Sequence, residues 1–160
     1  LIKKILMIKI NVLVKNKEWK KNINNPENYL KKKLKKLNKN YHYFRNKKLE
    51  FSLSLSRDAE IKKLNRKFRK KNKSTDILSF PFQKKFFLMS LLKKKNLIYL
   101  GDIMINLDKL KSNKNNTSFK LEFDKLWVHG FLHLLGHRHK VNKDFSKMKR
   151  LENRFIKILN

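Results

Sequence analysis

Alternating apolar and polar residues predict four β-strands along the chain. The clearest is residues 49–56, where Leu or Phe at every second position alternates with polar neighbours, the two-residue period of a strand with one buried face. Residues 5–14 and 97–107 are also rich in apolar and β-branched residues and are predicted to be strands. A fourth strand is expected within residues 74–82. Pro81 restricts it to a sheet edge or a strand end, because proline has no amide hydrogen to donate.

Apolar residues three or four positions apart predict helices between these strands. One helix is expected to begin at Pro26 with Asn25 as its cap, and another to begin near Asp58. The segment from about 118 to 135 is apolar on most sides, which favours a buried central helix. Gly136 is suited to end that helix in a left-handed conformation.

The remaining segments complete a single domain. The last helix is expected from about residue 144 to 159, with an apolar stripe facing inward: Met148, Leu151, Phe155 and Leu159. Residues 83–96 have the character of a variable loop insertion, in which four apolar residues are expected to pack as a short flap: Phe86, Phe87, Leu91 and Leu92. No internal repeat or linker divides residues 1–160, and a chain of 160 residues usually forms one domain.

The composition is strongly basic. The chain has 43 Lys and Arg residues against 12 Asp and Glu, which gives a formal net charge of +31. Of these basic residues 36 are Lys and 7 are Arg, and AT-rich coding sequence produces such a Lys excess without selection for nucleic-acid binding. The charge therefore predicts attraction to polyanions without identifying one. Because the chain has no cysteine, any transition metal must be bound by His and carboxylate side chains.

No segment indicates a membrane span or a signal peptide. No apolar stretch approaches the roughly 18 residues that a transmembrane helix needs. The N-terminus has a basic start and an apolar run, but Lys9 and Asn11 interrupt the run and no small-residue cleavage site follows. Because the first residue is Leu, the true start is expected at Met7 or outside this chain.

The histidines form the most informative cluster. Four of the five lie within eleven residues, at His129, His133, His137 and His139. Since His129 and His133 are four residues apart, they lie on one face of a helix and both imidazoles can bind one ion. A chain reversal at Gly136 can bring a third imidazole, from either His137 or His139, to the same ion.

Such a site indicates hydrolytic chemistry. Three neutral imidazoles leave a bound divalent ion its full charge and an open position for water, whose pKa falls to about 7. The pattern differs from the H-E-x-x-H signature of zinc proteases, because Gly130 follows His129. The alternative is a set of ordinary helix and cap histidines, which we disfavour because four lie so close together beside an apolar helix.

Two other segments contain candidate residues. Arg66 and Arg69 precede a predicted strand, and most surface arginines belong only to a solvated basic face. In a chain with so few arginines they are also candidate phosphate ligands, because guanidinium offers a fixed pair of donors. Asp102 follows Gly101 and is expected either to accept a hydrogen bond in a tight turn, which we favour, or to orient a ligand histidine.

Three segments resemble the YbeY-type endoribonucleases, also called rRNA maturation factors. HGFLHLLGHRH resembles the family's H-G-x-L-H-L-x-G-x-D-H, and LGDIMI resembles its L-G-D-I-x-I. LNRKFRKKNKSTDILSFPF is similar to the family's L-N-x-x-[YF]-R followed by T-[DN]-V-L-S-F-P. The three occur in the family's order, and the first 50 residues match only in general pattern.

The resemblance implies an α+β fold, a single compact domain in which a small mixed β-sheet packs against a central metal-bearing helix and other helices. It implies that His129, His133 and His139 bind one zinc ion, that His137 is variable and that Arg69 is the active-site arginine. It also implies cleavage of single-stranded RNA in ribosomal RNA processing, including maturation of the 16S rRNA 3′ end, and in ribosome quality control. The expected partner is the small ribosomal subunit, and the expected location is the cytoplasm or an organelle.

One position departs from the family pattern. The family has Asp immediately before the third histidine, whereas this chain has Arg138. If that Asp tunes a ligand or assists proton transfer, its loss weakens the metal or slows the chemistry. Two alternatives therefore remain: a non-catalytic, zinc-containing protein that binds RNA or the ribosome, and a hydrolase resembling metallopeptidases.

The charge predicts how RNA binding depends on salt. Because each neutralised phosphate releases counterions, affinity for single-stranded RNA should fall steeply as salt concentration rises. Binding measured by fluorescence anisotropy across a salt series tests this expectation. A shallow dependence would show that the excess lysines lie away from the RNA.

Overall fold

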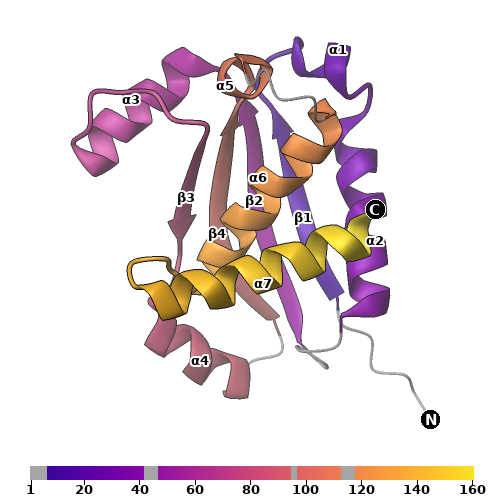
Figure 1. Cartoon of the computed structure of the whole chain (residues 1–160), viewed down its shortest axis with the longest axis vertical. Coiled ribbons are helices and arrows are strands. Elements are labelled where there is room, and N and C mark those ends of the chain that lie inside the picture. The colour runs from indigo at the N-terminus through magenta and orange to yellow at the C-terminus, as the bar shows by residue number, and fades with distance from the viewer. Residues whose placement is uncertain (1–6, 42–46, 95–96, 113–117) are drawn as a thin grey trace.

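The computed structural model describes residues 7–41, 47–94, 97–112 and 118–160, and within them four strands form one mixed sheet (Figure 1). The strand order is β1-β2-β4-β3, with the bounds β1 Met7–Val14, β2 Lys48–Ser56, β3 Ile77–Pro81 and β4 Leu97–Asn106. β1, β2 and β4 are parallel, whereas β3 pairs antiparallel with β4. The prediction that Pro81 lies in an edge strand or at a strand end is therefore confirmed, since β3 is at the sheet edge and ends at Pro81.

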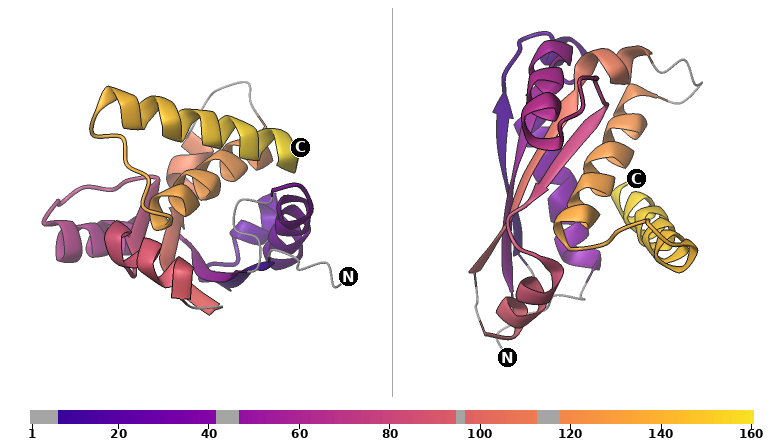
Figure 2. Two further views of the ribbon diagram at one scale, coloured as in Figure 1. Left: turned by 90° about the horizontal axis from the view of Figure 1, so that it is seen from below. Right: turned by 90° about the vertical axis from the view of Figure 1, so that its left-hand side faces the viewer.

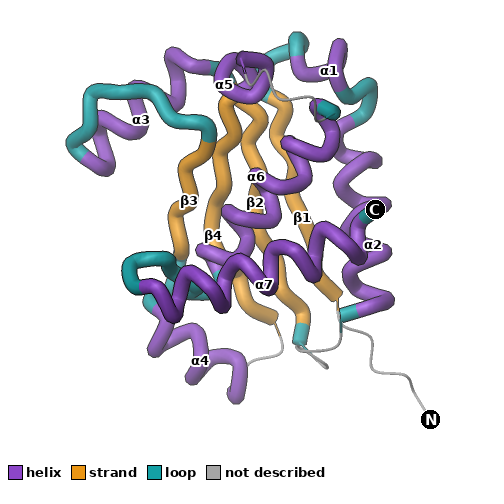
Figure 3. Tube along the Cα trace, viewed as in Figure 1, coloured by secondary structure: helices purple, strands orange, loops and turns teal. Residues whose placement is uncertain are grey.

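Helices cover the two faces of the sheet unequally. Their bounds are α1 Trp19–Asn22, α2 Pro26–Asn40, α3 Asp58–Arg69, α4 Lys85–Lys94, α5 Leu107–Ser112, α6 Phe119–Leu134 and α7 Asn142–Leu159. Figures 1 and 3 show α6 crossing the sheet with α7 in front of it, and the views in Figure 2 place α6 nearer the sheet than α7. The alternating residues of β2 are fully buried on this covered face, as their pattern predicts: Leu49, Phe51, Leu53 and Leu55. None of the helices in the described part of the chain is long and apolar enough to cross a bilayer.

The central helix α6 packs directly on the sheet at Gly130. A Cβ atom there would lie 2.8 Å from Cδ1 of Ile77 and 3.0 Å from Cγ2 of Ile103 and Oγ of Ser79. The absence of a side chain lets the helix backbone approach β3 and β4 closely. The glycine after His129 is therefore explained by packing, because this position faces the sheet.

A buried polar cluster holds the first half of α6 against α2. Asp124 is fully buried and accepts hydrogen bonds from the hydroxyl of Tyr29 at 2.9 Å and the indole of Trp127 at 3.0 Å. The ammonium of Lys33 pairs with the same carboxylate at 2.9 Å and also donates to the backbone oxygen of Leu159 at 3.2 Å. Burial raises the pKa of Tyr29, as does the charge of Asp124, so this hydroxyl remains a donor. The cluster links α2, α6 and the end of α7.

The opposite face is covered mainly by α3, over β3 and β4. Its apolar contacts form a small second core around Ile61, Leu78 and Met104. Nearby on the same face, the hydroxyl of Tyr99 donates to Oδ1 of Asp102 at 2.8 Å. Asp102 therefore accepts a structural hydrogen bond as expected, but it does so within strand β4, so the expected tight turn is wrong.

The expectation for residues 83–96 is wrong in part. The segment forms α4 instead of a loop flap, and Phe86 and Phe87 are 80% and 55% exposed instead of packed. Leu88 is the buried residue of this helix, and Leu91 and Leu92 pack partly against the core as expected. The short helices α1 and α5 were not predicted, because neither is long enough to show a helical period.

Gly101 offers a test of this fold. β2 pairs Glu50 with Tyr99 and Phe51 with Gly101, so Leu100 is an extra bulge residue without a partner on β2. Gly101 has φ +134°, and a Cβ atom there would collide with the backbone oxygen of Phe80. We expect Gly101→Ala to lower the free energy of unfolding by about 3 kcal/mol or more, because strain and overpacking add.

Urea unfolding measures this change, with Lys9→Ala on β1 as a control in an exposed strand position that should change stability by less than about 0.5 kcal/mol. Equal stability of Gly101→Ala and the parent would contradict the bulge geometry.

Candidate metal centre

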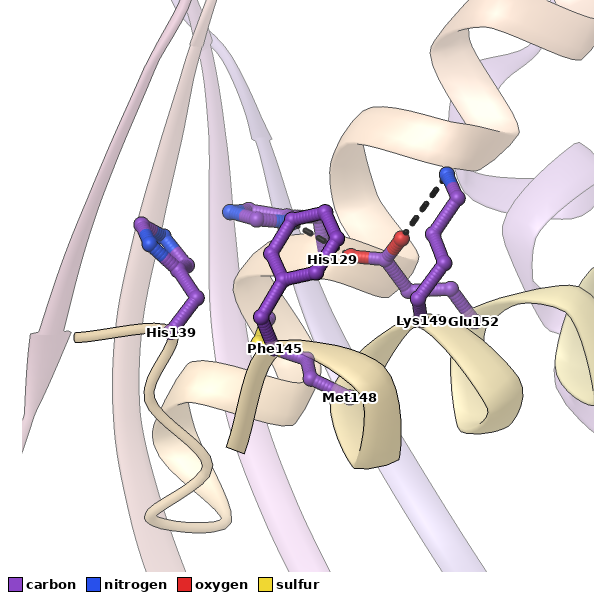
Figure 4. Close-up of a pocket in the computed structure, with 6 residues that line it drawn as sticks. All are labelled: His129, His139, Phe145, Met148, Lys149 and Glu152. Carbon is purple, nitrogen blue, oxygen red and sulfur yellow. Dashed lines mark hydrogen bonds and ion pairs between the residues drawn. The ribbon is translucent and has the colours of Figure 1, made fainter. Parts of the chain in front are cut away.

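Three of the four clustered histidines meet beside the C-terminal end of α6. His129 and His133 come from the last two turns of this helix, and His139 comes from the loop that follows. One ring nitrogen from each lies within 4.8 Å of the others. Figure 4 shows the imidazoles of His129 and His139 side by side above the start of α7. The structure therefore brings together the three histidines that the family pattern implied.

The chain reversal at Gly136 decides between the two candidates for the third imidazole. Gly136 has φ +86°, and its amide donates to the backbone oxygen of His133 at 2.9 Å. The next amide, of His137, donates to the backbone oxygen of Leu132 at 3.0 Å. These two bonds close the helix in the manner of a Schellman motif. The reversal brings His139 to the cluster, whereas His137 contributes its backbone.

Hydrogen bonds fix how the two helix histidines present their nitrogens. Nδ1 of His133 lies 2.9 Å from the backbone oxygen of His137, and Nδ1 of His129 lies 2.5 Å from Oε1 of Glu152 on α7. A carbonyl or carboxylate oxygen can only accept, so each Nδ1 carries the proton and each Nε2 has a free lone pair. These two Nε2 atoms lie 2.9 Å apart. Facing lone pairs repel unless a cation binds both, so the geometry fits a metal ion.

The electrostatics favour the neutral form of His133. Burial lowers the pKa of His133, although the hydrogen bond to the carbonyl of His137 opposes the change. Electrostatic interactions with His129, His139 and Arg69 lower the pKa of His133 further. A neutral imidazole is the form that binds metal.

Glu152 remains charged beside these histidines. Burial raises the pKa of Glu152, but the hydrogen bond with His129 and the charge of Lys149 outweigh it, so the pKa lies below its ordinary value. This residue was missed in the sequence. Glu152 lies on the buried face of α7, four residues after Met148 and three before Phe155. An acidic residue within an otherwise apolar helix face could have indicated a buried polar partner.

Arg69 reaches the cluster from the other face of the sheet. It is the last residue of α3, and its guanidinium donates to the backbone oxygen of Ser79 on β3 at 3.4 Å. The exposed guanidinium lies close enough to His133 to lower the pKa of that imidazole. Arg66 lies one turn earlier, on the exposed surface of α3. The structure thus places Arg69, a candidate phosphate ligand, within electrostatic range of His133.

The role of Glu152 can be tested by metal affinity. We expect Glu152→Ala to weaken Zn²⁺ binding by about 10-fold to 100-fold, because His129 loses the partner that orients its ring. Competition with a chromophoric chelator measures this affinity. Glu27→Ala removes an exposed carboxylate on α2 that pairs with Lys31 and should leave the affinity unchanged. Equal affinities of the two variants would contradict the assigned role.

Comparison with known proteins finds sequence relatives in one endoribonuclease family. The chain is similar to a YbeY endoribonuclease from Pelagibacter ubique, with 43% identity over 96% of this chain and 97% of the relative. It is 33% identical to one from a Wolbachia endosymbiont of Drosophila simulans, over 94% of this chain and 93% of the relative. The solution structure of TM1509 from Thermotoga maritima has the same fold, with a TM-score of 0.55 at 23% identity over 94% of this chain and 88% of that one.

The family model described as Endoribonuclease YbeY matches residues 13–160, which include the three histidines and Arg69. The sequence relatives of the chain and the arrangement of the three histidines at the end of α6 agree with this match. The chain belongs to the YbeY endoribonuclease family.

Proposed function

We propose that this protein is a zinc-dependent endoribonuclease that cleaves single-stranded RNA during ribosomal RNA maturation, including the 3′ end of 16S rRNA. We also propose a role in ribosome quality control, with the small ribosomal subunit as partner, in the cytoplasm. Membership of the endoribonuclease family supports RNA as the substrate. The facing Nε2 atoms of His129 and His133, 2.9 Å apart, are the observation that carries the proposed metal dependence.

The donor set fits zinc. His129, His133 and His139 would hold one ion through ring nitrogens, and the chain has no cysteine to compete with them. When bound, zinc would act as a Lewis acid and lower the pKa of a coordinated water. Three imidazoles also suit nickel, copper or iron, so metal analysis of the purified protein identifies the ion actually held.

The chain's own residues would position the substrate. The guanidinium of Arg69 would pair with the non-bridging oxygens of the scissile phosphate and stabilise the negative charge that develops there. Glu152 and the carbonyl of His137 would keep the histidine rings fixed while RNA binds. Lysines of the exposed segment 62–73 would attract the RNA backbone without reading its sequence.

The departure at Arg138 bears on the non-catalytic alternative. Arg138 is exposed, and both helix histidines have oriented partners that do not involve it. This arrangement would hold zinc in an active enzyme and in a zinc-containing binding protein alike. In either case RNA binding is expected, so cleavage is the measurement that separates the two.

The decisive experiment compares RNA cleavage by the parent and by His133→Ala. Loss of one ligand should reduce the cleavage rate of a single-stranded rRNA fragment by about 100-fold or more, as should a chelator. Lys125→Ala, at an exposed position of the same helix, is the control and should cleave at the parent rate.

Cleavage that persists in His133→Ala and with chelator would contradict metal catalysis. RNA that is bound but left intact by the zinc-loaded parent would establish the non-catalytic alternative. Hydrolysis of peptides in place of RNA would establish the metallopeptidase-like one.

A further inference from the structure

The apolar stripe of α7 continues beyond the core to an exposed aromatic ring. Met148 and Phe155 are 2% and 1% exposed and pack into the core. Phe145 lies three residues before Met148 on the same side of the helix, but 56% of its surface is exposed. The exposed ring of Phe145 therefore ends this stripe next to Met148, where both residues line one hollow.

Phe145 lies in the hollow that contains the metal-centre residues. A cavity of about 210 Å³ is lined by His129, His139, Phe145, Met148, Lys149 and Glu152. Figure 4 shows Phe145 rising from the first turns of α7 toward the histidines, while Glu152 on the same helix contacts His129. A ligand that fills this hollow lies against both the histidines and Phe145.

The helical turn that carries Phe145 is held firmly, although the ring is exposed. The amide of Phe145 donates to the backbone oxygen of Val141 at 3.0 Å, so the residue belongs to the hydrogen-bonded first turn of α7. Buried Met148 anchors the next turn, and the contact between Glu152 and His129 fixes the one after it. A ligand would thus meet a preorganised aromatic surface.

Positive charge lies near the ring and near the histidines. Lys149 lines the same hollow as Phe145, and the guanidinium of Arg69, which donates to the backbone oxygen of Ser79 on β3, lowers the pKa of His133. An aromatic ring beside cations matches single-stranded nucleic acid, whose phosphates follow the charges while a base stacks on the ring. Extended peptides and simple anions use only one of these two features.

We propose that Phe145 is a stacking platform for an unpaired nucleobase next to the phosphate held at the histidines. The inference rests on the proposed endoribonuclease function and adds the feature that selects single strands. A base within a duplex is already paired and stacked on its neighbours, so only a splayed base can lie against Phe145.

Steady-state kinetics on a short single-stranded RNA with one cleavage site test the platform. Phe145→Ala should raise KM roughly tenfold with kcat nearly unchanged, since stacking adds uniform binding. Phe145→Tyr should restore KM, because it retains the aromatic face. The control is Phe82→Ala, because Phe82 is 66% exposed and packs against Tyr99 on the opposite face of the sheet. That variant should behave as the parent does.

Abasic substrates show whether the lost contact is with a base. For the parent, removing one of the two bases that flank the cleaved phosphate should raise KM roughly tenfold. For Phe145→Ala the same removal should have no further effect, because ring and base act as a pair. An unchanged KM in Phe145→Ala, or an undiminished abasic penalty, would overturn the inference.

Fluorescence separates failure of the stacking claim from failure of the proposed function. RNA carrying 2-aminopurine at the flanking position is mixed with zinc-loaded protein, and quenching is recorded by stopped flow before cleavage. Quenching by the parent and Phe82→Ala, but not by Phe145→Ala, supports stacking even if no RNA is ever cut. Metal-dependent cleavage with equal quenching by all three proteins would refute stacking and leave the endoribonuclease function intact.

Discussion

The close contact between α6 and the sheet at Gly130 determines where the candidate site lies. The backbone of α6 approaches Ile77 and Ile103 so closely that a Cβ atom has no room without movement of neighbouring atoms. With this face of the helix fixed on β3 and β4, the adjacent His129 and His133 project beside it. Arg69 then reaches the cluster from α3 with its guanidinium on the carbonyl of Ser79, although α3 covers the other face of the sheet.

The three histidines are preorganised by groups outside their own cluster. The carboxylate of Glu152 and the carbonyl of His137 each hold one Nδ1 proton, which leaves the paired Nε2 lone pairs of His129 and His133 free. Two sets of contacts between segments distant in the sequence hold these groups in place. α7 brings Glu152 across α6, and the buried cluster around Asp124 links α6 to α2 and to the end of α7.

Local patterns predicted the parts of this protein that depend on local physics. The period of two residues located β2, Pro81 placed β3 at an edge, and the spacing of four put His129 and His133 on one face. From spacing alone His137 and His139 were equivalent, because only the path of the chain after Gly136 distinguishes them. The family resemblance favoured His139, and the geometry agrees.

Other features depended on tertiary contacts that no single segment contains. Glu152 lies 23 residues from His129, and its partnership exists only because α7 crosses α6. The apolar character of Phe86 and Phe87 suggested packing, but α4 turns Leu88 inward in their place. The net charge of +31 is a property of the whole chain, whereas the proposed cleavage of RNA depends on three histidines and one arginine.

X-ray absorption at the zinc edge of the purified protein tests the central claim most directly. The account predicts one zinc ion per chain with three imidazole nitrogens at about 2.0–2.1 Å and one further light-atom ligand. A shell made up mainly of oxygen atoms, or protein that binds no zinc when it is supplied, would contradict it.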